Sequence, residues 1–306
     1  MCTGKSHVHE PERGPAAASG SVLVSVVIPV RNVTTTIDEQ LAALEAQTYR
    51  GRWEVVVADN GSTDATRARV TAWEGRVPDL RCVEAAGKRG VAHARNVAIH
   101  AARGDMILIC DGDDVVDHEW VRYLAGALKE HALVTGFNDF EALNRPEQFD
   151  WMWDVASNGP PRACGFLPYA HGGNLGLRRG LFDALTGFNE SLRSFEDVDF
   201  GWRARYAGVA VHFEPRAVVH KRLRPSPMSV WRSALAGGMA EPVLYKRHRR
   251  QGMRRAQGWE VVGTYIWLAR SLGLAARPDG RHRWASVAGN RLGRAVGSMR
   301  RGVRFL

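Results

Sequence analysis

Apolar runs and amphipathic segments alternate through the first half of the chain. Residues 21–30 form a β-branched apolar run, which predicts a strand that is buried on both faces. Similar runs at 53–58, 81–85 and 105–110 predict three further strands. Helical patterns occupy residues 36–47, 90–102 and a segment opened by Ser62 and Asp64. This alternation predicts an α/β fold in which helices cover both faces of a parallel sheet.

Polar residues follow three of the predicted strands, at 29–32, 59–62 and 111–114. Ligands of open α/β sheets bind beyond the carboxyl ends of the strands, so we expect these three loops to line one crevice. The second half of the chain is less regular. There we expect a long loop over 140–168, strands at 171–179, 209–215 and 217–221, and a helix over 196–208.

Composition places the chain among globular proteins. Apolar residues make up 45% and charged residues 24% of its 306 residues, which excludes wholesale disorder. No run reaches the ~18 apolar residues that a membrane-spanning helix needs. Residues 1–20 indicate a disordered lead without the apolar segment of a signal peptide. The four cysteines are widely spaced, which argues against a disulfide framework and favours a cytoplasmic location.

Charge is distributed unevenly along the chain. Residues 220–306 contain 19 Lys and Arg against 3 Asp and Glu, whereas the preceding part is mildly acidic. This basic end predicts a polyanionic neighbour, and the absence of a nucleic-acid-binding motif argues against nucleic acid. Residues 284–306 place apolar side chains at helical spacing between arginines. Two interpretations follow: an interfacial helix on an anionic membrane surface, or a helix packed on the rest of the protein with a solvated basic face.

Asp111, Asp113 and Asp114 place three carboxylates directly after a predicted strand. Carboxylates gathered in this way repel one another unless a cation binds them, and hard oxygen ligands suit Mg²⁺ or Mn²⁺. The alternative is a solvated acidic turn. His220 follows another predicted strand; it is either structural or a further ligand of the metal site that Asp113 begins.

Glu196 and Asp197 open the predicted helix over 196–208. Acids at this position stabilise the helix dipole, and one of them is also a candidate general base. Gly172, Gly173 and Asn174 form either a plain turn or a segment whose backbone closely approaches a ligand. We include Gly173, Asn174 and Glu196 among the candidate pocket residues for acceptor and donor.

Seven motifs occur in an order that resembles glycosyltransferase family 2. They are VVIPVRN, VVVADNGSTDAT, GKRGVAHARNVAIHAARGD, ILICDGDD, GGNLGLRRGLFDALTGFNE, FEDVDFGWRARYAGV and EPRAVVH, between residues 22 and 220. The resemblance implies the GT-A fold, an α/β domain with a Rossmann-like nucleotide-binding half and an acceptor half. We therefore expect a disordered lead over 1–20, a GT-A catalytic domain over 21–222 and a basic, mainly helical extension over 223–306.

The resemblance also implies roles for individual positions. Pro29, Arg31, Asp59, Asn60 and Arg95 resemble the nucleotide-base pocket. Asp111 and Asp113 resemble the ribose and metal contacts, His220 a further metal ligand, and Asp197 the base of inverting members. Arg31 stands where Tyr is frequent, and Asn60 stands where a second acid often contacts uracil, so the donor is left open among UDP, dTDP and GDP sugars.

The resulting hypothesis is an inverting transferase that depends on Mn²⁺ or Mg²⁺ and moves a sugar to an acceptor hydroxyl, on a lipid-linked or surface glycan. One alternative is a sugar-phosphate nucleotidyltransferase, although residues 26–37 lack the glycine-rich phosphate loop typical of those enzymes. Another is a non-enzymatic polyanion-binding protein that uses the basic end of the chain; the acids at the strand ends argue against it.

Overall fold

The computed structural model describes residues 22–149, 159–255 and 258–305, so the predicted lead and part of the predicted long loop lie outside it. The first half contains β1 (Val24–Val30), α1 (Ile37–Glu45), β2 (Trp53–Asp59), α2 (Thr66–Thr71), β3 (Arg81–Glu84), α3 (Val91–Ala101) and β4 (Met106–Cys110). It follows the predicted alternation of strand and helix.

The second half adds shorter elements and a helical end. These are β5 (Val115–Val116), α4 (Trp120–Ala127), β6 (Leu133–Asp139), α5 (Pro146–Phe149), β7 (Asn174–Arg178), α6 (Arg179–Ala184), α7 (Glu196–Tyr206) and β8 (His212–His220). The chain continues through α8 (Pro227–His248), η1 (Arg249–Gln251), α9 (Gly258–Arg270), η2 (Leu272–Ala276) and α10 (Arg281–Arg301). The two strands predicted at 209–215 and 217–221 are one strand, β8.

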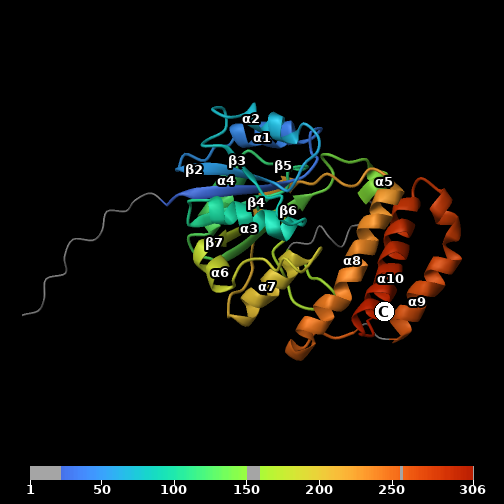
Figure 1. The fold of residues 1–306 in the computed structure, drawn as a ribbon. Helices are drawn as coiled ribbons and strands as arrows, with labels where there is room; N and C mark the ends of the chain where they lie inside the picture. The colour runs from blue at the N-terminus through green and yellow to red at the C-terminus, as the bar shows by residue number, and fades with distance from the viewer. Residues whose placement is uncertain (1–21, 150–158, 256–257, 306) are drawn as a thin grey trace, which may run out of the picture.

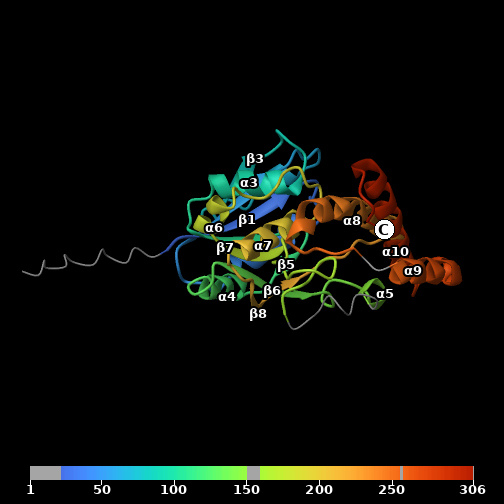
Figure 2. The ribbon, with the colours of Figure 1, turned by 90° about the horizontal axis from the view of Figure 1, so that it is seen from below.

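The strands form one mixed sheet in the order β3-β2-β1-β4-β7-β6-β8-β5. Strands β1 to β4 pair in parallel, as predicted. Strand β7 then pairs antiparallel to β4, and β6 pairs antiparallel to β7 and parallel to β8. Helices cover both faces of this sheet, with α1 and α2 on one side and α3 and α6 on the other (Figures 1 and 2).

Each central strand contributes side chains to two separate cores. Along β1, Val26 and Ile28 belong to the core beneath α1 and α4, whereas Val27 belongs to the core beneath α3 and α6. Successive side chains of a strand point to opposite faces, so a strand covered on both faces needs an unbroken apolar run. This requirement explains why the first strands could be found in the sequence.

The helices α8 and α10 lie side by side through a row of glycines. Gly289, Gly293 and Gly297 of α10 contact the backbone of α8 at Trp231, Leu235 and Met239, so the two helices run in parallel. At the C-terminal end of this pair, Leu244 of α8 and Phe305, which follows α10, share one further core with Trp202 of α7. The helical end of the chain therefore packs against α7 (Figure 1).

This packing agrees with the second interpretation of residues 284–306, a helix packed on the rest of the protein, while contact of this segment with a membrane stays a prediction. The buried row of α10 is formed by small residues such as Ala285 and Gly293, and the packed helix keeps a basic, solvated face. Leu292 and Met299, which the sequence assigned to the apolar row, are exposed by 47% and 76%.

In the parts of the chain that the structure describes, no helix combines the length and the apolar character needed to cross a bilayer.

The glycine row gives a first prediction. A methyl group on Gly293 would overlap the carbonyl oxygen of Leu235, so Gly293→Ala should push α8 and α10 apart and lower the free energy of unfolding by about 1–3 kcal/mol. Gly263 of α9 has open space around its Cα, and Gly263→Ala should instead raise stability by about 0.5–1 kcal/mol. Urea denaturation monitored by tryptophan fluorescence measures both changes; equal stability of the two variants would contradict this packing.

Candidate active site

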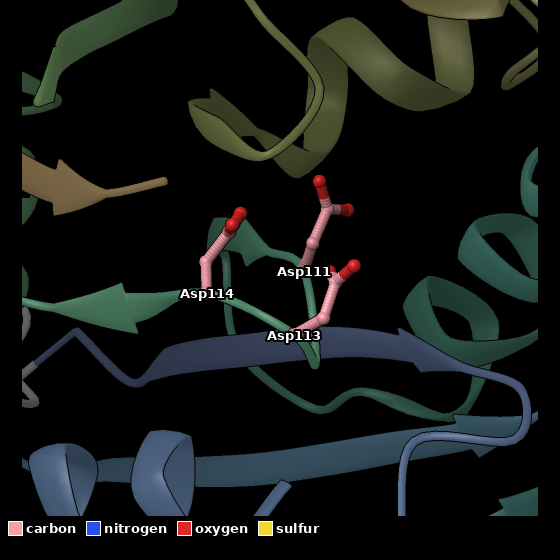
Figure 3. Close-up of side chains that lie close together, drawn as sticks. All are labelled: Asp111, Asp113 and Asp114. Carbon is pink, nitrogen blue, oxygen red and sulfur yellow. The ribbon is translucent and has the colours of Figure 1, made fainter. Parts of the chain in front are cut away.

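Three aspartates extend from the turn that follows β4, near the middle of the sheet. The carboxylates of Asp111, Asp113 and Asp114 offer oxygen atoms that all lie within 4.8 Å of one another. Figure 3 shows them pointing to the same side of the turn. Asp113 is exposed, and no other side chain of the described residues hydrogen bonds to its carboxylate. The predicted acidic cluster is therefore assembled, with Asp113 at its open side.

Lys221 supplies the positive charge inside this cluster. Its ammonium group contacts Asp114 closely and lies 3.2 Å from Oδ2 of Asp111. Burial opposes this charge, but the two carboxylates outweigh burial and raise the pKa of Lys221. Asp114 also accepts a 2.9 Å hydrogen bond from the backbone N–H of Arg222. Both carboxylate oxygens of Asp114 thus have partners within the protein, Lys221 and Arg222, which directly follow β8.

Arg95 links the acidic turn to the start of α7. From α3, its guanidinium lies 3.3 Å from Oδ1 of Asp111 and 2.5 Å from Oε1 of Glu196. Burial disfavours the charge of Arg95, yet Glu196 and Asp111 raise the pKa of its guanidinium. Arg95 and Glu196 are both buried. This arrangement makes Glu196 an internal partner of Arg95.

The backbone of Gly172 and Gly173 passes directly over this charge network. A methyl group on Gly172 would overlap the guanidinium of Arg95, and one on Gly173 would overlap the carboxylate of Asp111. The close approach of this backbone is to side chains of the protein, and approach to a ligand stays a prediction. The N–H of Gly172 donates a 2.8 Å hydrogen bond to Oδ2 of Asp197.

Asp197 is the half-buried member of the acid pair that begins α7. Its Oδ1 accepts a 2.8 Å hydrogen bond from the N–H of Val198, and Gly172 fixes its Oδ2. The preceding residue, Phe195, has a left-handed backbone with φ of 64°. The turn at Phe195 and the glycine backbone together hold the carboxylate of Asp197 in one orientation.

Two predicted nucleotide-pocket loops lie side by side beyond β1 and β2. The side chain of Asn32 accepts a 2.8 Å hydrogen bond from the N–H of Thr63, which joins the loops. Asp59 accepts a 2.9 Å hydrogen bond from the N–H of Ser62, and Arg31 is exposed. Pro29 is half-buried on β1, where it pairs with Ala58.

Asn60 organises the neighbouring loop. Its side-chain amide donates to the carbonyl oxygens of Ala85 and Lys88 at 2.5 and 2.8 Å, and its oxygen accepts from the N–H of Gly90 at 2.9 Å. Both amide hydrogens are thereby used to shape the segment that leads from β3 into α3. A base-reading role would have to come from the second lone pair of its oxygen.

Two predicted site residues lie next to the acidic turn along the backbone, but their side chains contact other groups. Asn174 is fully buried; its side chain accepts from Trp120 at 2.9 Å and donates to the carbonyl oxygens of Phe137 and Ala217. It joins β7 to β6 and β8 and does not line the pocket surface, because a central strand has no exposed face. His220 lies beside Val115 across the β5–β8 pair, and its Nδ1 is 2.6 Å from Oδ2 of Asp139. His220 is therefore outside the group of three aspartates.

Sequence reasoning missed Lys221 and His171. Lys221 directly follows His220, and His171 directly precedes the glycine pair, so both lay within predicted strands and next to the motifs. Burial and the ammonium of Lys221 lower the pKa of His171 to about 4, so its ring is neutral near pH 7. Consistent with this state, Nδ1 of His171 accepts a 3.2 Å hydrogen bond from the N–H of Gly173.

A cavity of about 750 Å³ lies between this site and the C-terminal helices. Phe195 and Arg222 line its site end, and Arg222 donates a 3.0 Å hydrogen bond to the carbonyl oxygen of Asp113. Thr264 of α9 and Arg291 of α10 line the other end, and apolar side chains form much of the remaining wall. The cavity thus connects the surroundings of Asp113 and Asp197 with the helical end of the chain.

The sheet order, the acidic turn after its central strand and the acid pair at the start of α7 define the GT-A class of α/β proteins, and two solved GT-A-like structures share this fold. The family model described as glycosyl transferase family 2 matches residues 25–186, which is more than half of the chain. The chain belongs to glycosyl transferase family 2, and the resemblance noted from its motifs is confirmed.

Comparison with individual proteins agrees with this assignment. The pre-mycofactocin glycosyltransferase of Mycobacterium tuberculosis is 27% identical over 301 residues. That match covers 94% of this chain and 60% of the relative, so the chain spans less than two thirds of the relative's length.

Two solved structures share the fold. The mannosyltransferase PcManGT from Pyrobaculum calidifontis, in complex with GDP-Man and Mn²⁺, has a TM-score of 0.65 at 22% identity, over 91% of this chain and 88% of that chain. TarS 1–349 from S. aureus, in complex with UDP, has a TM-score of 0.52 at 19% identity, over 92% of this chain and 93% of that chain.

The buried lysine gives a second prediction. Lys221→Met should lower the free energy of unfolding by about 3–5 kcal/mol at pH 7, because it leaves Asp114 buried without a cation and Asp111 with Arg95 alone. Lys88→Met removes an exposed lysine that pairs with Glu190 and should cost less than about 1 kcal/mol. Chemical denaturation of both variants tests the difference. The double variant Lys221→Met/Asp114→Asn should recover part of the loss; a Lys221→Met loss no larger than that of Lys88→Met would disprove the role.

Proposed function

We propose that this chain transfers a glycosyl group from a nucleoside-diphosphate sugar to an acceptor hydroxyl, with inversion at the anomeric carbon. The observation that carries the proposal is the presence of two acids in different settings. Asp113 is exposed on the acidic turn, and Asp197 is held by the Gly172 backbone at the start of α7. Family membership supports the class of reaction, and the neighbours solved with GDP-Man and with UDP support a nucleotide donor.

Asp111 and Asp113 are the side chains that would hold a divalent cation. Their carboxylates are hard oxygen ligands suited to both Mn²⁺ and Mg²⁺, and Asp113 is not taken up by another side chain of the described residues. Asp114 is left out because Lys221 contacts it more closely than it contacts Asp111 and the N–H of Arg222 takes its other oxygen. His220 is left out because it lies outside the group of three aspartates. A cation here would neutralise negative charge on the departing nucleoside diphosphate.

Asp197 is the proposed general base. Its carboxylate is half-buried and fixed, and it would accept the proton of the acceptor hydroxyl as that oxygen attacks the anomeric carbon. The bond from the sugar to the diphosphate breaks on the opposite side, so a single displacement inverts the configuration. Glu196 is the less suitable base because Arg95 occupies it.

The nucleotide would lie across the loops beyond β1 and β2. Arg31 is exposed there, and a guanidinium can stack on a base. Arg95 would act on the donor through Asp111, since the guanidinium is buried. The acceptor would enter through the cavity beside Phe195, and its apolar wall suits a lipid-linked acceptor presented at the cytoplasmic face of a membrane.

The third prediction concerns the cation. Asp113→Asn should reduce turnover of a nucleotide sugar by at least about 100-fold and weaken Mn²⁺ binding, while the fold is retained. Electron paramagnetic resonance of free Mn²⁺ in the presence of UDP or GDP measures binding without requiring activity. Asp183→Asn, which removes an exposed acid on α6, is the control and should change neither quantity. Full activity in EDTA would exclude this assignment.

The fourth prediction concerns the base. Asp197→Asn should lower transfer about 10²–10⁴-fold and leave nucleotide binding within a few-fold of the wild type, because an amide keeps the shape but cannot accept the proton. Product configuration, followed by the anomeric proton resonance, should be inverted. Retained configuration would disprove the mechanism, and turnover within threefold of the wild type would return Asp197 to a purely structural role at the start of α7.

A further inference from the structure

Helix α9 carries a large apolar surface on the outside of the protein. Its 13 residues include no buried one, and only Glu260 and Arg270 carry charge. Trp259, Val262, Tyr265 and Ile266 are exposed by 70%, 57%, 44% and 47%, and Leu272 of the following turn by 60%. A continuous exposed apolar surface of this kind marks a binding face rather than ordinary surface variation.

The opposite side of α9 is fixed to α10. The indole N–H of Trp284 donates to the carbonyl oxygen of Leu268 at 3.3 Å, and Arg291 donates to the hydroxyl of Thr264 at 2.8 Å. These contacts set the rotation of α9, so Val262 and Ile266 face away from α10. Both views of the ribbon place α9 at the outer edge of the molecule, beyond α10 as seen from the sheet (Figures 1 and 2).

Arginines border this apolar surface at both ends. Arg254 and Arg255 precede α9, Arg270 ends it, and Arg281 follows η2, all of them exposed; Arg277, also exposed, pairs with Asp279. An apolar helix face with cationic borders is complementary to a bilayer with anionic headgroups. It is poorly suited to a symmetric contact with a second copy, because an isologous interface repeats the same cationic patch on both sides.

We propose that α9 and η2 dock the protein on an anionic phospholipid surface and that this surface delivers the acceptor to the cavity beside α9. The apolar side chains would enter the boundary between headgroups and acyl chains, and the arginines would contact lipid phosphates. Thr264 and Arg291, which attach α9, also line the cavity that reaches Arg222 at the acidic turn. The docking step stands on the surface of α9 alone; the delivery of the acceptor rests on the proposed transferase function.

Co-sedimentation of the full chain with vesicles tests the docking step. Phosphatidylcholine vesicles that contain about 30% phosphatidylglycerol should bind the protein at least about 10-fold more strongly than pure phosphatidylcholine vesicles, and about 0.5 M salt should release it. The double variant Val262→Ser/Ile266→Ser should bind the anionic vesicles at least about 10-fold more weakly. Val22→Ser, which changes a side chain of equal exposure beside β1, should bind as the wild type does.

Folding of the double variant is checked by its thermal unfolding, which should match the wild type because both positions are exposed. Equal binding to neutral and anionic vesicles, or wild-type binding by the double variant, would overturn the proposal. So would a dimer in sedimentation velocity that the double variant breaks, since that result assigns α9 to a second copy.

A second readout separates docking from catalysis. Nucleotide-sugar turnover on a short soluble acceptor should be the same for the wild type and the double variant, because the proposed catalytic side chains lie outside α9. Turnover on an acceptor embedded in anionic vesicles should fall at least about 10-fold in the double variant only. If neither protein turns over any donor while vesicle binding persists, the proposed function fails and the docking step stands; unchanged turnover on the embedded acceptor would overturn the delivery step.

Discussion

The candidate site depends on a buried lysine that neutralises an acidic turn. Asp111 and Asp114 leave a strand that is buried on both faces, and carboxylates so placed are unstable without a nearby cation. Lys221, which directly follows β8, provides it, and β8 is separated from β1 and β2 in the strand order by β4, β7 and β6. The ion pairs of Lys221 with Asp111 and Asp114 therefore connect the first half of the fold with β8 at the candidate site.

The acids of the site differ in whether they have a cationic partner within the protein. Asp114 and Glu196 have partners within the protein, Lys221 and Arg95, and these pairs fix the geometry of the site. Asp113 remains exposed. The glycine pair at 172–173 makes this arrangement possible, since any side chain there would occupy the space of Arg95 and Asp111. Glu196 and Asp197 are adjacent in the sequence, but their partners differ: Glu196 pairs with Arg95, and Asp197 accepts a hydrogen bond from the N–H of Gly172.

The C-terminal helices extend the site rather than forming an independent unit. The row of glycines on α10 allows α8 and α10 to approach at backbone distance, and Trp202 of α7 shares a core with Leu244 of α8. Helix α9 is held outside this pair and keeps its apolar side chains on the surface. The cavity between these helices and the acidic turn is lined by residues from both, so the basic end of the chain lies next to the candidate site.

The sequence by itself determined the first four strands, the acidic turn and the acid pair of α7. Strands β1, β2 and β4 are buried on both faces and need unbroken apolar runs, whereas β3 is short and half-buried. The charged residues that follow β2 and β4 can be read directly from the sequence. Only the tertiary structure decided the partners of those charges: Lys221 at the acidic turn, Asp139 beside His220, and the sheet position of Asn174. It also packed α10 on α8 through a row of glycines and left the apolar side chains of α9, for which no role had been predicted, on the surface. Pairings between distant segments depend on strand order and helix contact, and neither is encoded in local periodicity.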